Sequence, residues 1–323
     1  MFKKLKLAVL VMLPVASAAE AALAQDYPTK PIRMVVAVAP AGPTDILARM
    51  IGQKLTESWG QPVIVDNRPG GGQVLGTDIV AKSPPDGYTL LMSTNTFAVN
   101  PALFKKLPYD PQRDFAPITL VAEVPLILAV HPSVPASTVK ELIAVAKARP
   151  GQLNYGSSGT SSSLRLAAEL MQSMANIQMV HVPYKGTSPA TTALVGGQVQ
   201  LMFTNPMVAL SQVKAGKLRA LAITSARRSD TIPELPTMSE AGLPGYTAGS
   251  WFGLMAPGKT SLAIVNKLHG EVVGILRTPN VQAQMAGSGA NAIGNTPQEF
   301  SSYIRADMAK WAKVIRASGI TAD

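Results

Sequence analysis

Two hydrophobic patterns alternate along the chain. Short apolar runs predict strands at residues 32–39, 63–66, 89–93, 126–131, 180–183, 201–204 and 218–224. Apolar positions three and four residues apart predict helices at residues 44–59, 138–149, 162–174, 189–195, 261–276 and 297–318. Strands that alternate with helices are typical of the α/β class, with mostly parallel sheets.

The length of the chain and two apolar extended stretches predict a two-lobed molecule. A chain of 323 residues that is 47% hydrophobic can build two cores. The stretches at residues 125–131 and 251–255 are interpreted as paired hinge strands. Residues 25–124 and 250–323 would then form lobe 1 and residues 125–249 lobe 2, with a ligand cleft where loops of both lobes meet.

The first residues have the pattern of an export signal. Lys3, Lys4 and Lys6 precede an apolar run at residues 7–19, and Ala22-Leu23-Ala24 matches a small-residue cleavage site. The run is too short to span a bilayer. We therefore predict a signal peptide at residues 1–24 and a mature protein in the periplasm, with no disulfide or lipid-anchor site because the chain has no cysteine.

The chain is basic, with 29 Lys and Arg against 19 Asp and Glu. Nucleic acid is a poor explanation, because the basic residues are scattered and only 5% of the residues are aromatic. A positive field that attracts small anions and a simple contribution to solubility both fit this charge.

Two loops have the composition of an anion cradle. Pro40-Ala41-Gly42-Pro43-Thr44-Asp45 joins a predicted strand to a predicted helix, so the first N–H groups of the helix point into the loop. The segment 155–163 repeats this arrangement with Gly and hydroxyl residues. In both cases the alternative is structural: many such turns bind nothing, and Ser or Thr there commonly caps the helix.

A third candidate loop contains Tyr184, Lys185 and Gly186. Lys185 is a possible anion partner, although an exposed lysine is more often simply solvated. The Tyr184 ring could wall a pocket while its hydroxyl donates a hydrogen bond.

The sequence offers little support for catalysis or metal binding. His131, His181 and His269 are far apart and lack metal-ligand spacing, and Thr160 breaks the G-x-S-x-G pattern of a hydrolase elbow. We predict no metal, no cofactor and no catalytic residue. A secreted serine hydrolase stays open as an alternative, and it requires a histidine within reach of a serine in segment 155–163.

Several ordered motifs together resemble one known family. They include Tyr27-Pro28-Thr29-Lys30-Pro31-Ile32-Arg33, Val65-Asp66-Asn67-Arg68-Pro69-Gly70, Pro85-Asp86-Gly87-Tyr88-Thr89, Tyr155-Gly156-Ser157-Ser158-Gly159, Val182-Pro183-Tyr184-Lys185-Gly186 and Trp251-Phe252-Gly253. These motifs span the mature chain and resemble the Bug family, the extracytoplasmic solute receptors of tripartite tricarboxylate transporters.

The resemblance implies a type II periplasmic binding-protein fold, with two lobes joined by two hinge strands. It also implies a monomer that captures a small carboxylate, such as a di- or tricarboxylate or an aromatic acid, and delivers it to membrane permease subunits. A ligand-dependent partner of a sensor kinase is a further alternative with the same site. The ligand-binding residues that it implies are Pro40, Ala41, Gly42, Thr44, Asp45, Thr94, Asn95, Ser158, Gly159, Thr160, Ser161, Ser162, Tyr184, Lys185, Gly186, Thr204 and Asn205.

The chain departs from the family pattern at several of these positions. Ala41 and Ser161 stand where glycine is usual, and Arg165 stands where histidine is common. Thr204 replaces an aspartate found in many relatives. Without that carboxylate a ligand amino group loses a partner, which favours a plain carboxylic acid over an amino acid.

Overall fold

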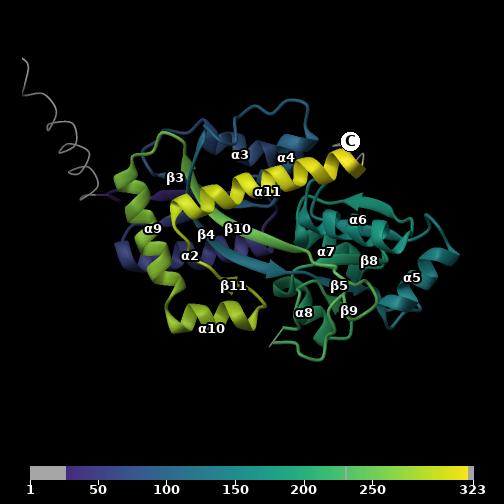
Figure 1. Cartoon of the computed structure of the whole chain (residues 1–323). Coiled ribbons are helices and arrows are strands. Elements are labelled where there is room, and N and C mark those ends of the chain that lie inside the picture. The colour runs from purple at the N-terminus through teal and green to yellow at the C-terminus, as the bar shows by residue number, and fades with distance from the viewer. Residues whose placement is uncertain (1–26, 230, 319–323) are drawn as a thin grey trace, which may run out of the picture.

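The computed structural model describes residues 27–229 and 231–318, and its elements pack around two β-sheets (Figure 1). The predicted signal peptide, residues 1–24, lies outside the described residues. Within them, no helix combines the length and the apolar character needed to cross a membrane. The fold is the predicted two-lobed α/β type, with one lobe on each sheet.

The first lobe is built on a six-stranded sheet with the order β11-β4-β10-β3-β1-β2. Its strands are β1 (Ile32–Val36), β2 (Val63–Asn67), β3 (Thr89–Thr94), β4 (Phe115–Pro125), β10 (Gly249–Pro257) and β11 (Asn291–Ala292). Its helices are α2 (Pro43–Trp59), α3 (Val74–Ala81), α4 (Thr96–Leu103), α9 (Leu262–Leu276), α10 (Pro279–Gly287) and α11 (Pro297–Ser318), with a 3-10 turn η1 (Gly71–Gln73) before α3. One sheet face buries Met34 with Ile51 of α2, and the other buries Trp251 with Phe300 of α11.

The second lobe is built on a five-stranded sheet with the order β7-β6-β8-β5-β9. Its strands are β5 (Ile127–Val130), β6 (Asn154–Ser157), β7 (Val180–Pro183), β8 (Leu201–Thr204) and β9 (Arg219–Ile223). Its helices are α5 (Val139–Ala148), α6 (Ser163–Ala175), α7 (Thr187–Val195) and α8 (Pro206–Lys214). The core joins Tyr155, Met171 and Phe203, all fully buried.

Both sheets are mixed, which corrects the prediction of mostly parallel sheets. β1 is parallel to β2 and β3, but β10 runs antiparallel to β3 and β4. In the second sheet β6 is parallel to β7 and β8, and β5 is antiparallel to β8 and β9. These antiparallel pairs all involve β5 or β10, the strands that follow the crossings from one sheet to the other, and β11 is also antiparallel to β4.

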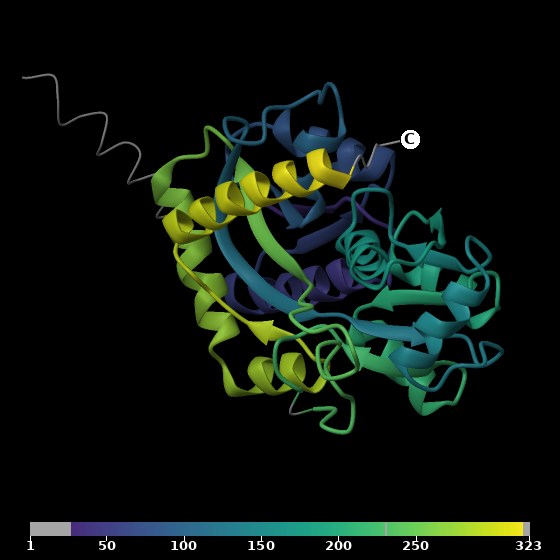
Figure 2. The same cartoon turned by 45° about the vertical axis from the view of Figure 1, so that its right-hand side comes forward.

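The chain crosses between the lobes twice, and one residue links the crossings. Leu126 lies between β4 and β5, and Ala248 precedes β10. The fully buried Thr224 accepts a hydrogen bond from Leu126 N at 2.7 Å and donates one to Ala248 O at 2.6 Å. Figure 2 shows the two lobes side by side, with α11 running along the first lobe toward α6.

Candidate functional site

The first cradle is the loop from β1 to α2. Gly42 is the N-cap of α2 with no side-chain hydrogen bond, and Pro43 supplies the fixed backbone angle that suits the first helical turn. Thr44 and Asp45 are both buried, at 5% and 3% exposure. Since no side chain caps this helix, its N-terminal amides are available to a ligand in the cleft.

Asp45 holds the shape of this loop. Its Oδ2 accepts hydrogen bonds from Ala41 N and from Arg49 Nε, each at 2.9 Å. Burial opposes ionisation of Asp45, but these hydrogen bonds keep the pKa of the carboxyl below its ordinary value. The carboxylate thus fixes Ala41, which has a left-handed φ of 62° that L residues adopt only with strain.

The second cradle is the loop from β6 to α6. Ser162 is the N-cap of α6: its Oγ accepts from Arg165 N at 3.3 Å and donates to Gly159 O at 2.8 Å. The hydroxyl of Ser162 therefore caps the helix, which is the structural alternative that the sequence left open. Gly159 has a φ of 132°, and its carbonyl also accepts from the Ser157 hydroxyl at 3.0 Å.

The two cradles are in contact through the loop between β7 and α7. Ala39 N of the first lobe donates to Lys185 O of the second at 3.0 Å. A Cβ added to Gly186 would lie 3.2 Å from Ala39 N and Ala39 Cβ, closer than ordinary packing allows. This glycine therefore lets the loops of the two lobes approach one another.

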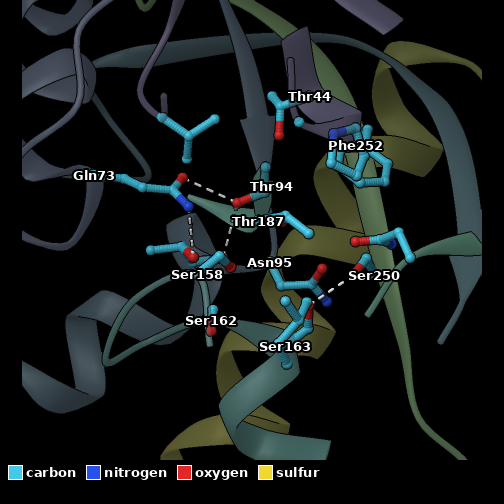
Figure 3. Close-up of a pocket in the computed structure, with 16 residues that line it drawn as sticks. Thr44, Gln73, Thr94, Asn95, Ser158, Ser162, Ser163, Thr187, Ser250 and Phe252 are labelled. Carbon is cyan, nitrogen blue, oxygen red and sulfur yellow. Dashed lines mark hydrogen bonds between the residues drawn. The ribbon is translucent and has the colours of Figure 1, made fainter. Parts of the chain in front are cut away.

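A small cavity lies where these loops converge (Figure 3). Its volume of about 20 Å³ is enough for roughly one water. Its lining residues come from both lobes and carry no ionised side chain: Val38, Gly42, Pro43, Thr44, Gln73, Thr94, Asn95, Thr96, Ser158, Ser162, Ser163, Leu164, Thr187, Asn205, Ser250 and Phe252. Any charge bound there would be held by hydroxyls, amides and helix N-termini.

Hydrogen bonds tie the walls of this cavity together. Gln73 accepts from Thr94 Oγ1 and donates to Thr96 Oγ1, each at 3.0 Å. Ser163 of α6 and Ser250 of β10 are linked across the lobes by a hydrogen bond of 2.7 Å between their Oγ atoms. The walls are thus pre-organised by neutral groups.

The structure brings together only part of the predicted site. The predicted residues that line the cavity are Gly42, Thr44, Thr94, Asn95, Ser158, Ser162 and Asn205. Those that lie outside its lining are Pro40, Ala41, Asp45, Gly159, Thr160, Ser161, Tyr184, Lys185, Gly186 and Thr204. Several of the latter shape the loops around it: Lys185 through its carbonyl and Gly186 through its missing side chain.

Several lining residues were missed by sequence reasoning. Gln73 follows three glycines and has a left-handed backbone, with φ at 73°. Thr187 follows Gly186 at the start of α7, so its position directly after the predicted loop could have identified it as a lining residue. Ser250 and Phe252 belong to β10; residues 251–255 were interpreted as a hinge strand, but their apolar pattern gave no sign that side chains of this strand line the cavity.

Buried polar atoms without a partner cluster near the cavity. Ser161 Oγ, Thr204 Oγ1 and Asn205 Nδ2 have no hydrogen-bond partner in the described part of the chain. Asn205 is 1% exposed and lines the cavity. An orphaned amide donor in such a place is costly unless a ligand supplies the acceptor.

A histidine does lie next to a serine of the second cradle. Ser157 Oγ and His181 Nε2 are 2.6 Å apart, so the histidine that the hydrolase alternative requires is within reach of a serine. Ser157 is fully buried and does not line the cavity. Burial and the positive charge of Arg165 lower the pKa of His181 to about 4, so the ring is neutral at pH 7. The Ser157 hydroxyl donates to Gly159 O, and the serine is buried away from the cavity, so the pair stabilises the loop and does not face the cavity.

Two lobes that meet over a neutral, donor-rich cleft define a solute-binding protein. A profile described as tripartite tricarboxylate transporter family receptor matches residues 47–320. The chain belongs to this family, and its resemblance to the Bug proteins is confirmed: it is 39% identical to BugT of Bordetella pertussis, over 92% of this chain and 91% of BugT. The family consists of receptors, and the chain is a binding protein rather than an enzyme.

Two solved structures from Rhodopseudomonas palustris are similar throughout. Rpa4515, solved with adipate, has a TM-score of 0.90 and 37% identity, with 92% of this chain and 99% of that chain covered. MatC, solved with bound malate, has a TM-score of 0.85 and 32% identity, with 90% and 100% covered. Both ligands are dicarboxylates. Among the described residues of this chain, no group of three or more His, Asp or Glu could hold a metal ion.

Proposed function

We propose that this protein captures a small carboxylate in the cleft and delivers it to the permease subunits of a tripartite tricarboxylate transporter. The observation that carries the proposal is the cavity itself, where donors from both lobes converge and Asn205 Nδ2 lacks an acceptor. The dicarboxylates bound by two similar proteins support the ligand class.

The proposal assigns the roles by position. Gly42 and Thr44 would hold the carboxylate through the N-terminus of α2, while Ser158 and the start of α6 approach it from the second lobe. Asp45 would orient the first cradle without touching the anion, because like charges repel. The remaining predicted ligand residues would shape the loops.

Ligand entry would require the lobes to separate. A cavity of about 20 Å³ does not accommodate a dicarboxylate. We propose that residues 25–124 and 250–323 move as one lobe and residues 125–249 as the other, about the crossings beside Thr224. The protein would act as a monomer in the periplasm after loss of residues 1–24.

A thermal-shift screen of residues 25–323 tests the ligand class. Mono-, di- and tricarboxylates, aromatic acids, aspartate and glutamate are compared, since a ligand that binds the folded state raises its stability. The proposal predicts the largest shifts for plain carboxylates, confirmed by calorimetry. If aspartate or glutamate exceeds every simple dicarboxylate, the inference from Thr204 is wrong; if no carboxylate binds, the function is wrong.

Delivery needs a separate test. A strain that lacks this receptor should lose uptake of the best ligand at low external concentration and regain it with the wild-type chain. A strain that lacks the permease subunits should show the same loss. Normal uptake without the permease would refute delivery while leaving the binding assignment intact.

A further inference from the structure

A second and much larger hollow lies at the hinge. It has a volume of about 860 Å³ and is bounded by α6, by α11 and by the crossing segments near Pro125, Thr224 and Ala248. We call it the hinge groove. Asn95, Ser163 and Ser250 line both the groove and the small cavity, so these residues form the partition between them.

Aromatic side chains form one wall of the hinge groove. Trp251, Tyr303 and Trp311 all line it, and the rings of Trp251 and Tyr303 meet edge to face with centroids 6.1 Å apart. The ammonium of Lys310 lies 4.9 Å from the centre of the Trp311 ring. This wall therefore already accepts a cation on an aromatic face.

The ionisable groups of the groove are mainly acidic. Glu169 is neutralised by Arg165, with Nε and Oε1 3.2 Å apart. Glu123 and Asp307 have no basic side chain within 4.0 Å among the residues that the structure describes. Lys310 is the basic residue of the lining, and its side chain is exposed.

Neutral donors hold the two carboxylates in place. Tyr303 OH donates to Glu123 Oε1 at 2.9 Å, and Trp251 Nε1 donates to Asp307 Oδ2 at 2.8 Å. Burial raises the pKa of Asp307, the hydrogen bond from Trp251 and the positive charge of Lys310 partly oppose this rise, and the negative charge of Glu123 adds to it. Two carboxylates fixed against aromatic rings, without a bound counter-charge, are complementary to a positive ligand.

We propose that the hinge groove is a second ligand site, which binds an organic cation: a protonated amine with an aromatic or apolar body. The ammonium binds to the carboxylates of Glu123 and Asp307, and the body packs on Tyr303 and Trp311. The ligand chemistry is opposite to that of the cleft, whose lining is neutral and donor-rich. The groove site does not depend on the identity of the carboxylate.

Calorimetry with phenethylammonium tests this proposal, with 2-phenylethanol as the neutral probe of similar shape. The amine should bind at least about tenfold more tightly than the alcohol, because only the amine meets the carboxylates. Asp307→Asn and Glu123→Gln should each weaken amine binding about fivefold or more. Lys310→Gln should strengthen it, since it removes a competing positive charge.

Matched controls separate the groove from other effects. Lys313→Gln removes a charge from the same helix outside the groove lining and should leave amine affinity unchanged. Thr44→Ala alters the cleft and should also leave it unchanged. Circular dichroism checks that each variant is folded. Equal binding of amine and alcohol, or equal effects of the Lys310 and Lys313 variants, would overturn the proposal.

Discussion

At the scale of single residues, Thr44 and Ser158 face one cavity from opposite lobes. If each donates one hydrogen bond to a bound carboxylate, Thr44→Ala or Ser158→Ala should cost about 1 to 2 kcal/mol of binding free energy. Calorimetry with the best ligand from the screen measures this loss. Thr192→Ala, which removes an exposed hydroxyl on α7, is the control. Unchanged affinity in both cleft variants would remove these residues from the site.

His181 supports a second prediction at this scale. Its pKa is about 4 in the folded protein and about 6.5 when unfolded. Between these values the unfolded state takes up a proton that the folded state does not, so stability falls as pH drops from about 6.5 to about 4 and is unaffected above that window. His181→Gln should remove up to about 3 kcal/mol of this pH dependence.

Urea unfolding at pH 7.5 and pH 4.5 measures this effect. The free energy of unfolding of the wild type should drop more between the two pH values than that of the His181→Gln variant. The imidazole signals of His181 in NMR report its titration directly. A folded-state transition near pH 6.5 would show that the burial argument fails.

The site illustrates what residue patterns can and cannot predict. Thr44 and Ser158 lie in strand-to-helix loops, and that local signal led to them, whereas Asn95 was predicted only through the family resemblance. Gln73 depends on a left-handed backbone after Gly72, and its partners Thr94 and Thr96 lie in β3 and α4. Such a position follows from tertiary packing, which no local pattern encodes.

At the scale of elements, Thr224 joins the two crossings. Thr224→Val keeps the shape of the side chain but leaves Leu126 N and Ala248 O without their hydrogen bonds. Each buried group left unpaired costs about 1 to 3 kcal/mol, so with two such groups the free energy of unfolding should fall by about 2 to 6 kcal/mol. Urea unfolding measures it. Thr224→Ser, which keeps the hydroxyl, should lose much less, and equal losses would contradict the argument.

Helices with a strong apolar stripe were predicted well, and most short ones were not, although the nine-residue α7 was expected at residues 189–195. The expected helix at residues 261–276 is α9, capped by Ser261, and the expected helix at 162–174 is α6, capped by Ser162. α3, α4, α8 and α10 have eight or nine residues each and were not predicted. A short helix shows too few turns for a clear period, so tertiary packing decides it.

β4 was also missed apart from Pro125, for a physical reason. Pro117 interrupts the strand pattern, because proline cannot donate to a neighbouring strand. In the structure Pro117 pairs with Met255 beside a register shift between Leu254 and Met255. The irregularity accommodates the proline, and it depends on the partner strand from the far end of the chain.

At the scale of the whole molecule, the contact between lobes depends on the space at Gly186. This residue has a φ of 150°, and an added Cβ would press on Ala39 of the other lobe. Gly186→Ala should therefore keep the lobes apart and weaken ligand binding about tenfold or more. Small-angle scattering with saturating ligand should show a radius of gyration that shrinks for the wild type but not for the variant.

Backbone strain alone could also weaken a Gly186 variant, and Gly216 offers the control that separates the two effects. Gly216 has a φ of 69°, and an added Cβ there would meet nothing within 4 Å. Gly216→Ala should lower stability through strain but leave both closure and affinity intact. If the Gly186 variant still closes and binds like the wild type, the approach of Ala39 to Gly186 does not limit closure, and the lobes must meet through the contact between Ser163 and Ser250 instead.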